Sequence, residues 1–338
     1  MPTPPALMAR IAARHEVDVS HITSSFAHGQ ASLTALQSSL REQFPPDSVP
    51  GFELLITGSI AKRQCTRGSD IDFFGVAEEE LPADRTEPII AAVLHQALAM
   101  GFDVPYAQGP GAAIVPRAEI ETIHFTDDIR RVFRRMMLVT ASASGYRPEL
   151  RASMLRAVLA GLVGRERSPR VRGLVDHLIQ LNRLGNIASE ARMSDRNADG
   201  GLVHWAKAFT LYRVEFAGSL AAAFRAEASC ANSDDLIEEL ASRFDQLPLL
   251  RLLEWYDDVG DEGKQALADI VAVSNDCLRL FAMEGARPRL AANQDDEPTR
   301  ALREAFEEQM SRIGGALVRL FHREPALRPW TEELGLFG

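Results

Sequence analysis

The sequence of 338 residues has few cysteines, and those it has form no recognisable pattern. Cys65, Cys230 and Cys277 are odd in number and show neither a CxxC pair nor a Cys/His spacing. A disulfide framework and a structural zinc site are therefore both disfavoured. We expect a protein of a reducing compartment.

The sequence also lacks a long apolar run and an excess of basic charge. It has no stretch of about 18 consecutive apolar residues, the length a membrane-spanning helix needs, and its N-terminal residues lack the apolar core of a signal peptide. The 37 Lys and Arg residues are outnumbered by 47 Asp and Glu, which gives a net charge of -10. This argues against a broad surface for nucleic acid. We expect a cytoplasmic protein without a membrane partner.

What the sequence does contain is typical of a globular protein with two parts. Hydrophobic residues make up 46% and charged residues 25%. Apolar spacing and turn residues predict an alternation of helices and short strands in the first part, with helices over 22–44 and 87–101 and strands over 52–57, 69–77, 102–107 and 112–115. From residue 127 onward the pattern is helical almost to the end. We therefore predict an α+β fold, with strands and helices in residues 1–140 and an all-helical domain in 141–338.

Two aspartates stand one residue apart inside the apolar stretch "SDIDFFGVA". On a strand, Asp70 and Asp72 would project from the same face, where their charges repel each other. A divalent cation between them removes this repulsion, and Mg²⁺ usually takes one or two carboxylates together with phosphate oxygens. The pair therefore predicts a metal site.

A Gly-Ser turn, Gly58 and Ser59, lies between the strand "FELLIT" and a short predicted helix. The first N–H groups of a helix have no partner within it, so they favour an anion such as phosphate. Lys62, Arg63 and Arg67 add positive charge nearby. Together with the two aspartates, the turn predicts a site for a metal-bridged triphosphate.

The segment "GSIAKRQCTRGSDIDFFG" resembles the signature of the DNA polymerase beta-like nucleotidyltransferase superfamily, a Gly-Ser followed about ten residues later by Asp-x-Asp. The resemblance implies a nucleotidyltransferase-type mixed sheet, Mg²⁺ (with Mn²⁺ as an alternative ion) and a nucleoside triphosphate. It also implies transfer of a nucleotidyl group to a hydroxyl, with release of pyrophosphate. Gly58 and Ser59 match the phosphate-binding positions, and Asp70 and Asp72 match the metal ligands.

The superfamily commonly has a third carboxylate, which binds metal and accepts the proton of the attacking hydroxyl. Asp103 in "GFDVPYA" is our candidate for this role, and Glu119 and Glu121 are alternatives. The helical half is similar to that of bacterial nucleotidyltransferases related to the PII-protein uridylyltransferase. That narrower resemblance implies phosphate-binding roles for Arg183, Lys207 and Arg213, and a packing role for Trp205.

Several other polar residues are interpreted as structural. We expect Arg134 and Arg135 on a solvated helix face, His124 and His177 as structural histidines, and Cys65 as a packing residue. For the acceptor, the acidic charge favours a protein or a small molecule over RNA. Two alternatives stay open: a catalytically silent nucleotide sensor, and an RNA-directed nucleotidyltransferase toxin.

Overall fold

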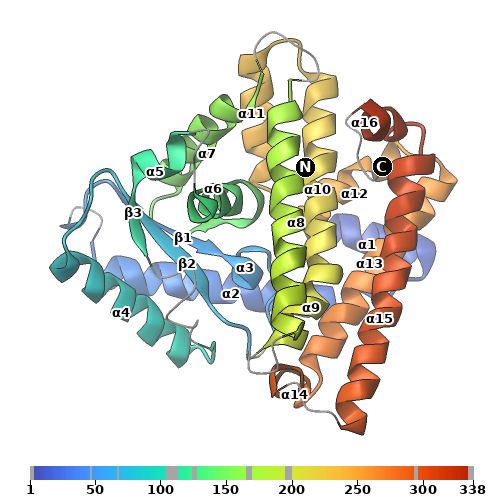
Figure 1. The fold of residues 1–338 in the computed structure, drawn as a ribbon, viewed down its shortest axis with the longest axis horizontal. Coiled ribbons are helices and arrows are strands. Elements are labelled where there is room, and N and C mark those ends of the chain that lie inside the picture. The colour runs from blue at the N-terminus through green and yellow to red at the C-terminus, as the bar shows by residue number, and fades with distance from the viewer. Residues whose placement is uncertain are drawn as a thin grey trace. The chain divides into compact units, whose positions relative to one another are not determined.

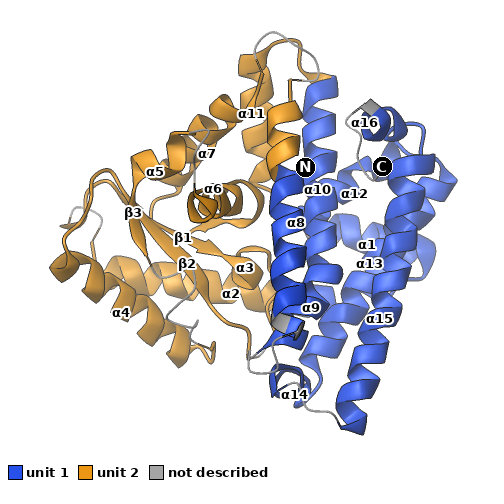
Figure 2. Ribbon diagram, in the orientation of Figure 1, with its two compact units in different colours: residues 1–24, 178–228, 248–338 blue, residues 25–177, 229–247 orange. Residues whose placement is uncertain are grey.

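A computed structural model describes residues 4–45, 48–66, 68–103, 113–123, 128–164, 170–194, 200–292 and 296–333. Its elements divide into two compact units (Figure 2). The sheet unit comprises residues 25–177 and 229–247, and the helical unit comprises 1–24, 178–228 and 248–338. Two parts were predicted, but with one boundary near residue 140. The units found are each discontinuous in the sequence.

The sheet unit contains a mixed sheet of four strands in the order β3-β2-β1-β4 (Figure 1). The strands are β1 (Phe52–Thr57), β2 (Asp72–Ala77), β3 (Ile114–Pro116) and β4 (Ala143–Ser144). β1 pairs antiparallel with both β2 and β4, and β2 pairs parallel with β3. The α+β prediction is therefore confirmed at the level of a small mixed sheet accompanied by helices.

Helices lie on both faces of this sheet (Figure 1). The helices of the unit include α2 (Ser20–Gln43, from residue 25), α3 (Gly58–Ala61), α4 (Ala83–Ala99), α5 (Arg117–Glu121), α6 (Ile129–Ala141), α7 (Pro148–Leu162), the start of α8 (Arg172–Ser194) and α11 (Ser233–Phe244). Leu36 of α2 and Val93 of α4 share one hydrophobic cluster with Leu54 of β1 and Phe73 of β2. α6 and α7 contact β1 on the other face. Burial on both faces explains why β1 is a nearly continuous apolar run.

β4 corrects one part of the sequence prediction. Residues 141–338 were predicted to be all-helical, yet Ala143 and Ser144 pair with Ile56 and Leu55 of β1. Two residues are too few to produce an alternating pattern, and the surrounding "ASASGYRP" has the composition of a loop. The remainder of the described C-terminal region is helical, as predicted.

The helical unit is built around α13 (Asp261–Ala282). Its other elements are α1 (Pro4–His15), the rest of α8, α9 (Gly201–Phe209), α10 (Leu211–Ser229), α12 (Pro248–Leu253), the 3-10 helix η2 (Glu254–Asp257), α14 (Ala286–Ala292), α15 (Glu297–Val318), the π-helix η3 (Arg319–Arg323) and α16 (Arg328–Glu333). α15 packs along α13, where the ring centroids of Phe281 and Phe306 are 4.8 Å apart. Asn275 of α13 accepts hydrogen bonds from the backbone N–H groups of His21 and Ile22 at the start of α2. These contacts attach the N-terminal segment to the helical unit.

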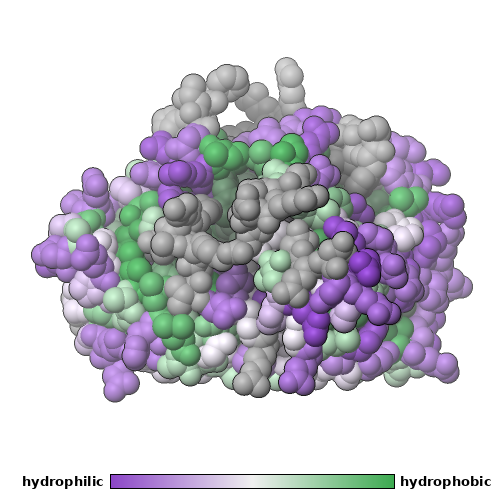
Figure 3. All heavy atoms as spheres, turned by 60° about the horizontal axis from the view of Figure 1, so that its bottom comes forward, coloured by the Kyte–Doolittle hydropathy of each residue, from purple (hydrophilic) through white to green (hydrophobic). Residues whose placement is uncertain are grey.

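On the face shown in Figure 3, the coloured residues are mainly hydrophilic, with separate hydrophobic patches among them. The most exposed large apolar residues lie on several helices and, for Met283, just after α13: Leu98, Ile129, Phe133, Leu184, Ile187, Met283 and Val318. Exposed apolar residues in such small groups are normal on a folded protein. None of the described helices is both long and apolar enough to cross a membrane.

Candidate functional site

The Gly-Ser turn and Asp72 are in direct contact. β1 ends at Thr57, which faces Asp72 across the antiparallel ladder, and Gly58 follows with a φ of +64°. A Cβ on Gly58 would lie 2.1 Å from Oδ2 of Asp72, so the carboxylate occupies the space that a side chain would need. Only glycine suits this position, because it tolerates the left-handed backbone and leaves room for the carboxylate. The two halves of the signature therefore meet in space.

Asp70 is positioned on the same side of the chain as Asp72. Ser69, Ile71 and Phe73 have at most 1% of their surface exposed, whereas the two aspartates between them are partly exposed. This alternation is the one expected of an extended segment with one buried face. β2 itself begins only at Asp72, so the predicted strand over 69–77 starts later than expected.

Asp103 lies beside Asp70 through a single parallel backbone bridge. The N–H of Ile71 donates to the carbonyl oxygen of Asp103 at 3.2 Å, and the N–H of Asp103 donates to that of Ser69 at 3.0 Å. Side chains of directly paired residues lie on the same side of a sheet. Asp103 thus joins the edge that carries the two signature aspartates, and its side chain is exposed.

The alternative carboxylates are engaged with arginines. Oε1 of Glu121 accepts from Nε of Arg117 at 2.6 Å. Oε2 of Glu119 lies 3.7 Å from Nε of Arg131 and 3.9 Å from Nη1 of Arg134. Of the three candidates for a third carboxylate, only Asp103 has backbone contact with the signature strand.

A metal ion at this position would need phosphate oxygens as ligands in addition to protein carboxylates. In the described part of the chain, no three His, Cys, Asp or Glu side chains are grouped closely enough to hold a metal ion by themselves. Mg²⁺ tolerates this, because it usually keeps several waters and uses one or two carboxylates plus substrate phosphates. The residues that could hold it are Asp70 and Asp72.

Ser59 carries a polar atom that lacks a partner. It is 9% exposed, and its Oγ is buried without a hydrogen-bond partner in the described part of the structure. Oγ1 of Thr66, in the loop before Asp70, is in the same condition. A buried hydroxyl left unpaired costs about 1–3 kcal/mol. α3 has only four residues and no side-chain cap, so an anion here would depend on the hydroxyl and the N–H groups more than on a helix dipole.

Lys62 and Arg63 follow α3 directly. Lys62 is buried, with 5% of its surface exposed. Nη1 of Arg63 donates to the carbonyl oxygens of Ile60 and Ala61, at 3.0 and 2.8 Å, and its Nε donates to Oε1 of Gln30 at 3.0 Å. Burial lowers the pKa of Arg63. The guanidinium is therefore held in place beside the turn; its predicted role in phosphate binding stays a prediction.

The other predicted phosphate ligands belong to the helical unit. Arg183 is exposed on α8, Lys207 is 8% exposed on α9, and the half-buried Arg213 of α10 stacks over the ring of Phe209 at 5.1 Å. Burial lowers the pKa of Arg213. Trp205 is buried, which confirms its predicted packing role. The sheet unit contains the signature residues, and these three cations lie outside it.

The prediction of a solvated face for Arg134 and Arg135 was wrong. Arg135 is fully buried: its Nε donates to the carbonyl oxygen of Ile120 at 2.9 Å, and its Nη2 to that of Thr122 at 2.7 Å. Only 12% of the Arg134 side chain is exposed, beside Glu119. Both point toward α5, whose C-terminal carbonyl groups favour cations, a contact that helical spacing alone does not reveal.

The remaining residues interpreted as structural agree with that interpretation where they are described. Cys65 is 1% exposed, and Nδ1 of His177 contacts the carbonyl oxygen of Gly173, one turn earlier, at 2.9 Å. His124 and Arg67 lie outside the described residues.

Glu53 is a buried carboxylate that the sequence interpretation missed. Its Oε1 accepts from Oγ of Ser144 at 2.8 Å and from the N–H groups of Gly145 and Tyr146, and its Oε2 accepts from the N–H of Arg147. Burial raises its pKa to about 7, against the opposing effect of these donors. The available signal was a lone acidic residue in "FELLIT". Glu53 holds the segment after β4 against β1.

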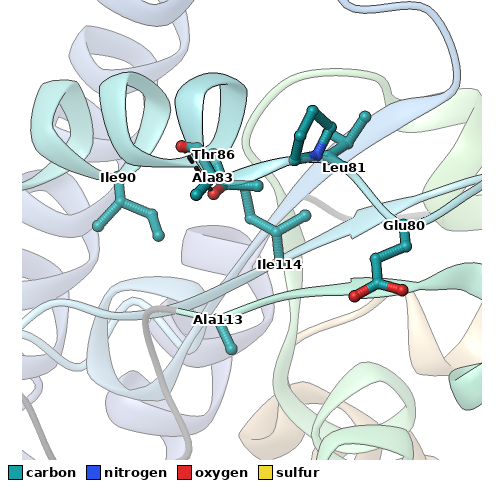
Figure 4. A pocket seen from close by; sticks show the side chains of 8 residues that line it. Glu80, Leu81, Ala83, Thr86, Ile90, Ala113 and Ile114 are labelled. Carbon is teal, nitrogen blue, oxygen red and sulfur yellow. Dashed lines mark hydrogen bonds between the residues drawn. The ribbon is translucent and has the colours of Figure 1, made fainter.

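A separate open pocket of about 660 Å³ lies beside α4 and β3 (Figure 4). Its walls include Leu81, Ile90 and Ile114, and Glu80 contributes a carboxylate. Ile114 pairs with Gly75 of β2. None of the predicted site residues lines this pocket.

The scan against protein-family models found no match, and the search of curated proteins found no significant similarity.

Proposed function

We propose that the chain is a Mg²⁺-dependent nucleotidyltransferase that moves a nucleotidyl group from a nucleoside triphosphate to a hydroxyl acceptor. The observation that carries the proposal is the contact between Gly58 and Oδ2 of Asp72. It joins a predicted phosphate-binding turn to a predicted metal ligand. The unpartnered hydroxyl of Ser59 in the same turn supports the proposal, because a bound phosphate oxygen would satisfy it.

In this mechanism Asp70 and Asp72 hold the ion, which when bound neutralises charge on the phosphates. The Gly-Ser turn and Lys62 bind the β- and γ-phosphates and orient the α-phosphorus. Asp103 accepts the proton of the acceptor hydroxyl. The acceptor oxygen forms a bond to the α-phosphorus, the bond from that phosphorus to the bridging oxygen breaks, and pyrophosphate leaves. The net charge of -10 favours a protein or small-molecule acceptor over RNA.

The test measures pyrophosphate release from each of the four ribonucleoside triphosphates, with Mg²⁺ and with cell lysate as the source of acceptors. We expect release by the wild type and none by Asp70→Asn/Asp72→Asn. Glu80→Gln, which neutralises an exposed carboxylate of the same unit, is the matched control and should retain full release. Equal release by the aspartate variant and the wild type would refute the proposal.

The third carboxylate has its own test. If Asp103 is the proton acceptor, Asp103→Asn should lower the rate by about 10²–10⁴-fold, the usual contribution of a general base. Glu119→Gln should leave the rate unchanged, because Glu119 contacts arginines of α6. A large loss of rate in Glu119→Gln, with none in Asp103→Asn, would assign the role of proton acceptor to Glu119.

A second candidate is a catalytically silent nucleotide sensor. One observation favours it: the described residues contain no group of three potential metal ligands. A sensor would bind nucleotide without Mg²⁺ and without releasing pyrophosphate, and Asp72→Asn would leave its affinity intact. The same protein preparations distinguish the two functions.

A further inference from the structure

Arg151 of α7 lies at the end of β1 from which the Gly-Ser turn begins. Its Nε donates to Oγ of Ser142 at 3.0 Å, and only 6% of Arg151 is exposed. Ser142 is extended and directly precedes Ala143, which pairs with Ile56. One further step along this antiparallel ladder brings Ser142 beside Thr57, the residue before the turn. A buried guanidinium is thereby fixed near the predicted phosphate site.

Arg63 supplies a second fixed guanidinium in the same region. Burial lowers the pKa of Arg63, the interaction with Cys65 raises it, and the positive charge of Arg151 has a smaller lowering effect. Two like charges close together in a partly buried region repel each other. The carboxylate paired with Arg151 is that of Asp245, at 2.6 Å, whose side chain is 71% exposed and so is well screened by solvent. An anion between the arginines would relieve the remaining repulsion.

Arg63 is oriented by neutral partners, and Arg151 is oriented by one neutral partner and one carboxylate. Arg63 donates to a glutamine and to backbone carbonyls, and Arg151 donates to Ser142 in addition to its ion pair. Nη2 of each arginine has no hydrogen-bond partner among the residues that the structure describes. Guanidinium groups already held in place lose less freedom on binding a phosphate, and they bind it with charge-assisted hydrogen bonds.

We propose that Arg151, together with Arg63, binds the terminal phosphates of a polyphosphate beside the Gly-Ser turn. This inference rests on the proposed function and deepens it, because it assigns the triphosphate end of the substrate to the sheet unit itself. Sequence reasoning missed Arg151, since its position depends on the pairing of β4 with β1. The ligand class is an inorganic or nucleotide-borne di- or triphosphate.

The test is calorimetric titration of the full chain with inorganic tripolyphosphate, once with Mg²⁺ and once with EDTA. We expect Arg151→Met to weaken the Kd at least about tenfold in both conditions, the effect of losing a charged hydrogen bond. Arg156→Met is the matched control: Arg156 is also on α7 and pairs with Glu238 of α11 at 2.8 Å. It removes the same charge and a similar contact, and it should leave the Kd unchanged.

Two further variants test whether the role of Arg151 is purely structural. Asp245→Asn removes the ion pair but keeps the guanidinium, so we expect it to bind tripolyphosphate at least as tightly as the wild type. Arg151→Lys keeps the charge and loses the forked geometry, so its Kd should be intermediate; it replaces Arg151→Met if that variant fails to fold. Equal weakening by Asp245→Asn and Arg151→Met, or no weakening by either Arg151 variant, would overturn the proposal.

The outcome separates this inference from the proposed function. Tripolyphosphate binding that depends on Arg151, without pyrophosphate release from any nucleotide, would leave the anion site standing and reject the transferase. Aspartate-dependent release of pyrophosphate, with no effect of Arg151→Met on the Kd for tripolyphosphate, would support the transferase and reject the anion site at Arg151.

Discussion

Glu53 and Asp72 are two carboxylates on the same face of the sheet, and their surroundings differ. Glu53 and Thr57 are four residues apart on β1 and so share a face, and Thr57 pairs directly with Asp72. Glu53 is fully buried, and four donors of the chain itself satisfy it. Asp72 is partly exposed and rests on a glycine beside the unpartnered hydroxyl of Ser59.

The difference distinguishes a structural carboxylate from one suited to a ligand. The donors around Glu53 are already used, so the group stabilises the fold. Near Asp72, a donor is still without an acceptor and the carboxylate is accessible, a combination that a metal-bound phosphate would complete. Substitution of Glu53 should therefore lower the stability, whereas substitution of Asp72 should lower the activity.

The largest expected effect is on activity, from Asp72→Asn. Charge stabilisation by a bound metal is worth several kcal/mol, so we expect pyrophosphate release to fall at least a hundredfold. The variant should remain folded, because Asp72 is partly exposed at the first position of its strand. Parallel assays of release and thermal unfolding measure both. A large fall in the midpoint would show that Asp72, like Glu53, is structural.

The largest expected effect on stability comes from Glu53→Leu. It leaves three N–H groups and a hydroxyl without their acceptor, at a cost on the order of 3–5 kcal/mol in the free energy of unfolding. Urea denaturation measures this cost, and release per folded molecule should be unchanged. A loss of activity in fully folded protein would place Glu53 in the site.

The pH dependence of stability should carry the signature of Glu53. Its pKa of about 7 in the folded protein lies above the ordinary value of 4.5, so the folded state binds the proton more tightly than the unfolded state. Its contribution to stability is therefore greatest below pH 4.5 and falls by about 3 kcal/mol as the pH rises to 7. Glu53→Gln should lack this fall. Urea unfolding of the wild type and Glu53→Gln at pH 5 and pH 8 measures this change in the free energy of unfolding. The same change in both proteins would contradict the prediction.

Gly58→Ala should be more costly than Gly101→Ala. Both glycines have positive φ, +64° and +78°, so alanine at either position costs about 1 kcal/mol from backbone strain. A Cβ on Gly101 meets nothing within 4 Å, whereas one on Gly58 collides with Asp72. We expect an additional loss of stability, and weaker nucleotide binding, only for Gly58→Ala. Equal losses of stability in the two variants would mean that Asp72 moves away from the new Cβ at no energetic cost.

The smallest effect is expected from Ser59→Ala. Removing an unpaired buried hydroxyl should leave the stability unchanged or raise it by up to about 1 kcal/mol. The same change should weaken the Kd for tripolyphosphate several-fold, because a phosphate oxygen loses its donor. Denaturation measures the change in stability, and calorimetry on the same preparation measures the change in the Kd. Lower stability together with unchanged binding would identify a structural hydroxyl.

Much of the region around the signature was predictable from local patterns. The apolar run of β1, the Gly-Ser turn, α3, β2 and the amphipathic α4 all lie close to their predicted positions. These elements are encoded by residues near one another in the chain, so periodicity and turn residues identify them. The edge that brings Asp70, Asp72 and Asp103 onto adjacent backbones follows from that order of elements.

What could not be predicted depends on contacts between distant parts of the chain. β4 is two residues long, and only its pairing with β1 defines it. The acceptors of Arg135 are carbonyls 13 and 15 residues away, so the residues next to it in the sequence do not indicate that it is buried. The unpartnered state of the Ser59 hydroxyl and the position of Arg151 likewise exist only in the assembled unit.

The most direct test of the central claim is a titration of Mn²⁺, followed by electron paramagnetic resonance, with and without a non-hydrolysable nucleoside triphosphate. If the aspartates and the Gly-Ser turn form one site, metal and nucleotide should tighten each other's binding in the wild type at least about tenfold, a reciprocal linkage. Asp72→Asn should abolish this coupling. Nucleotide binding that is equally tight with EDTA, and unchanged by Asp72→Asn, would contradict the account.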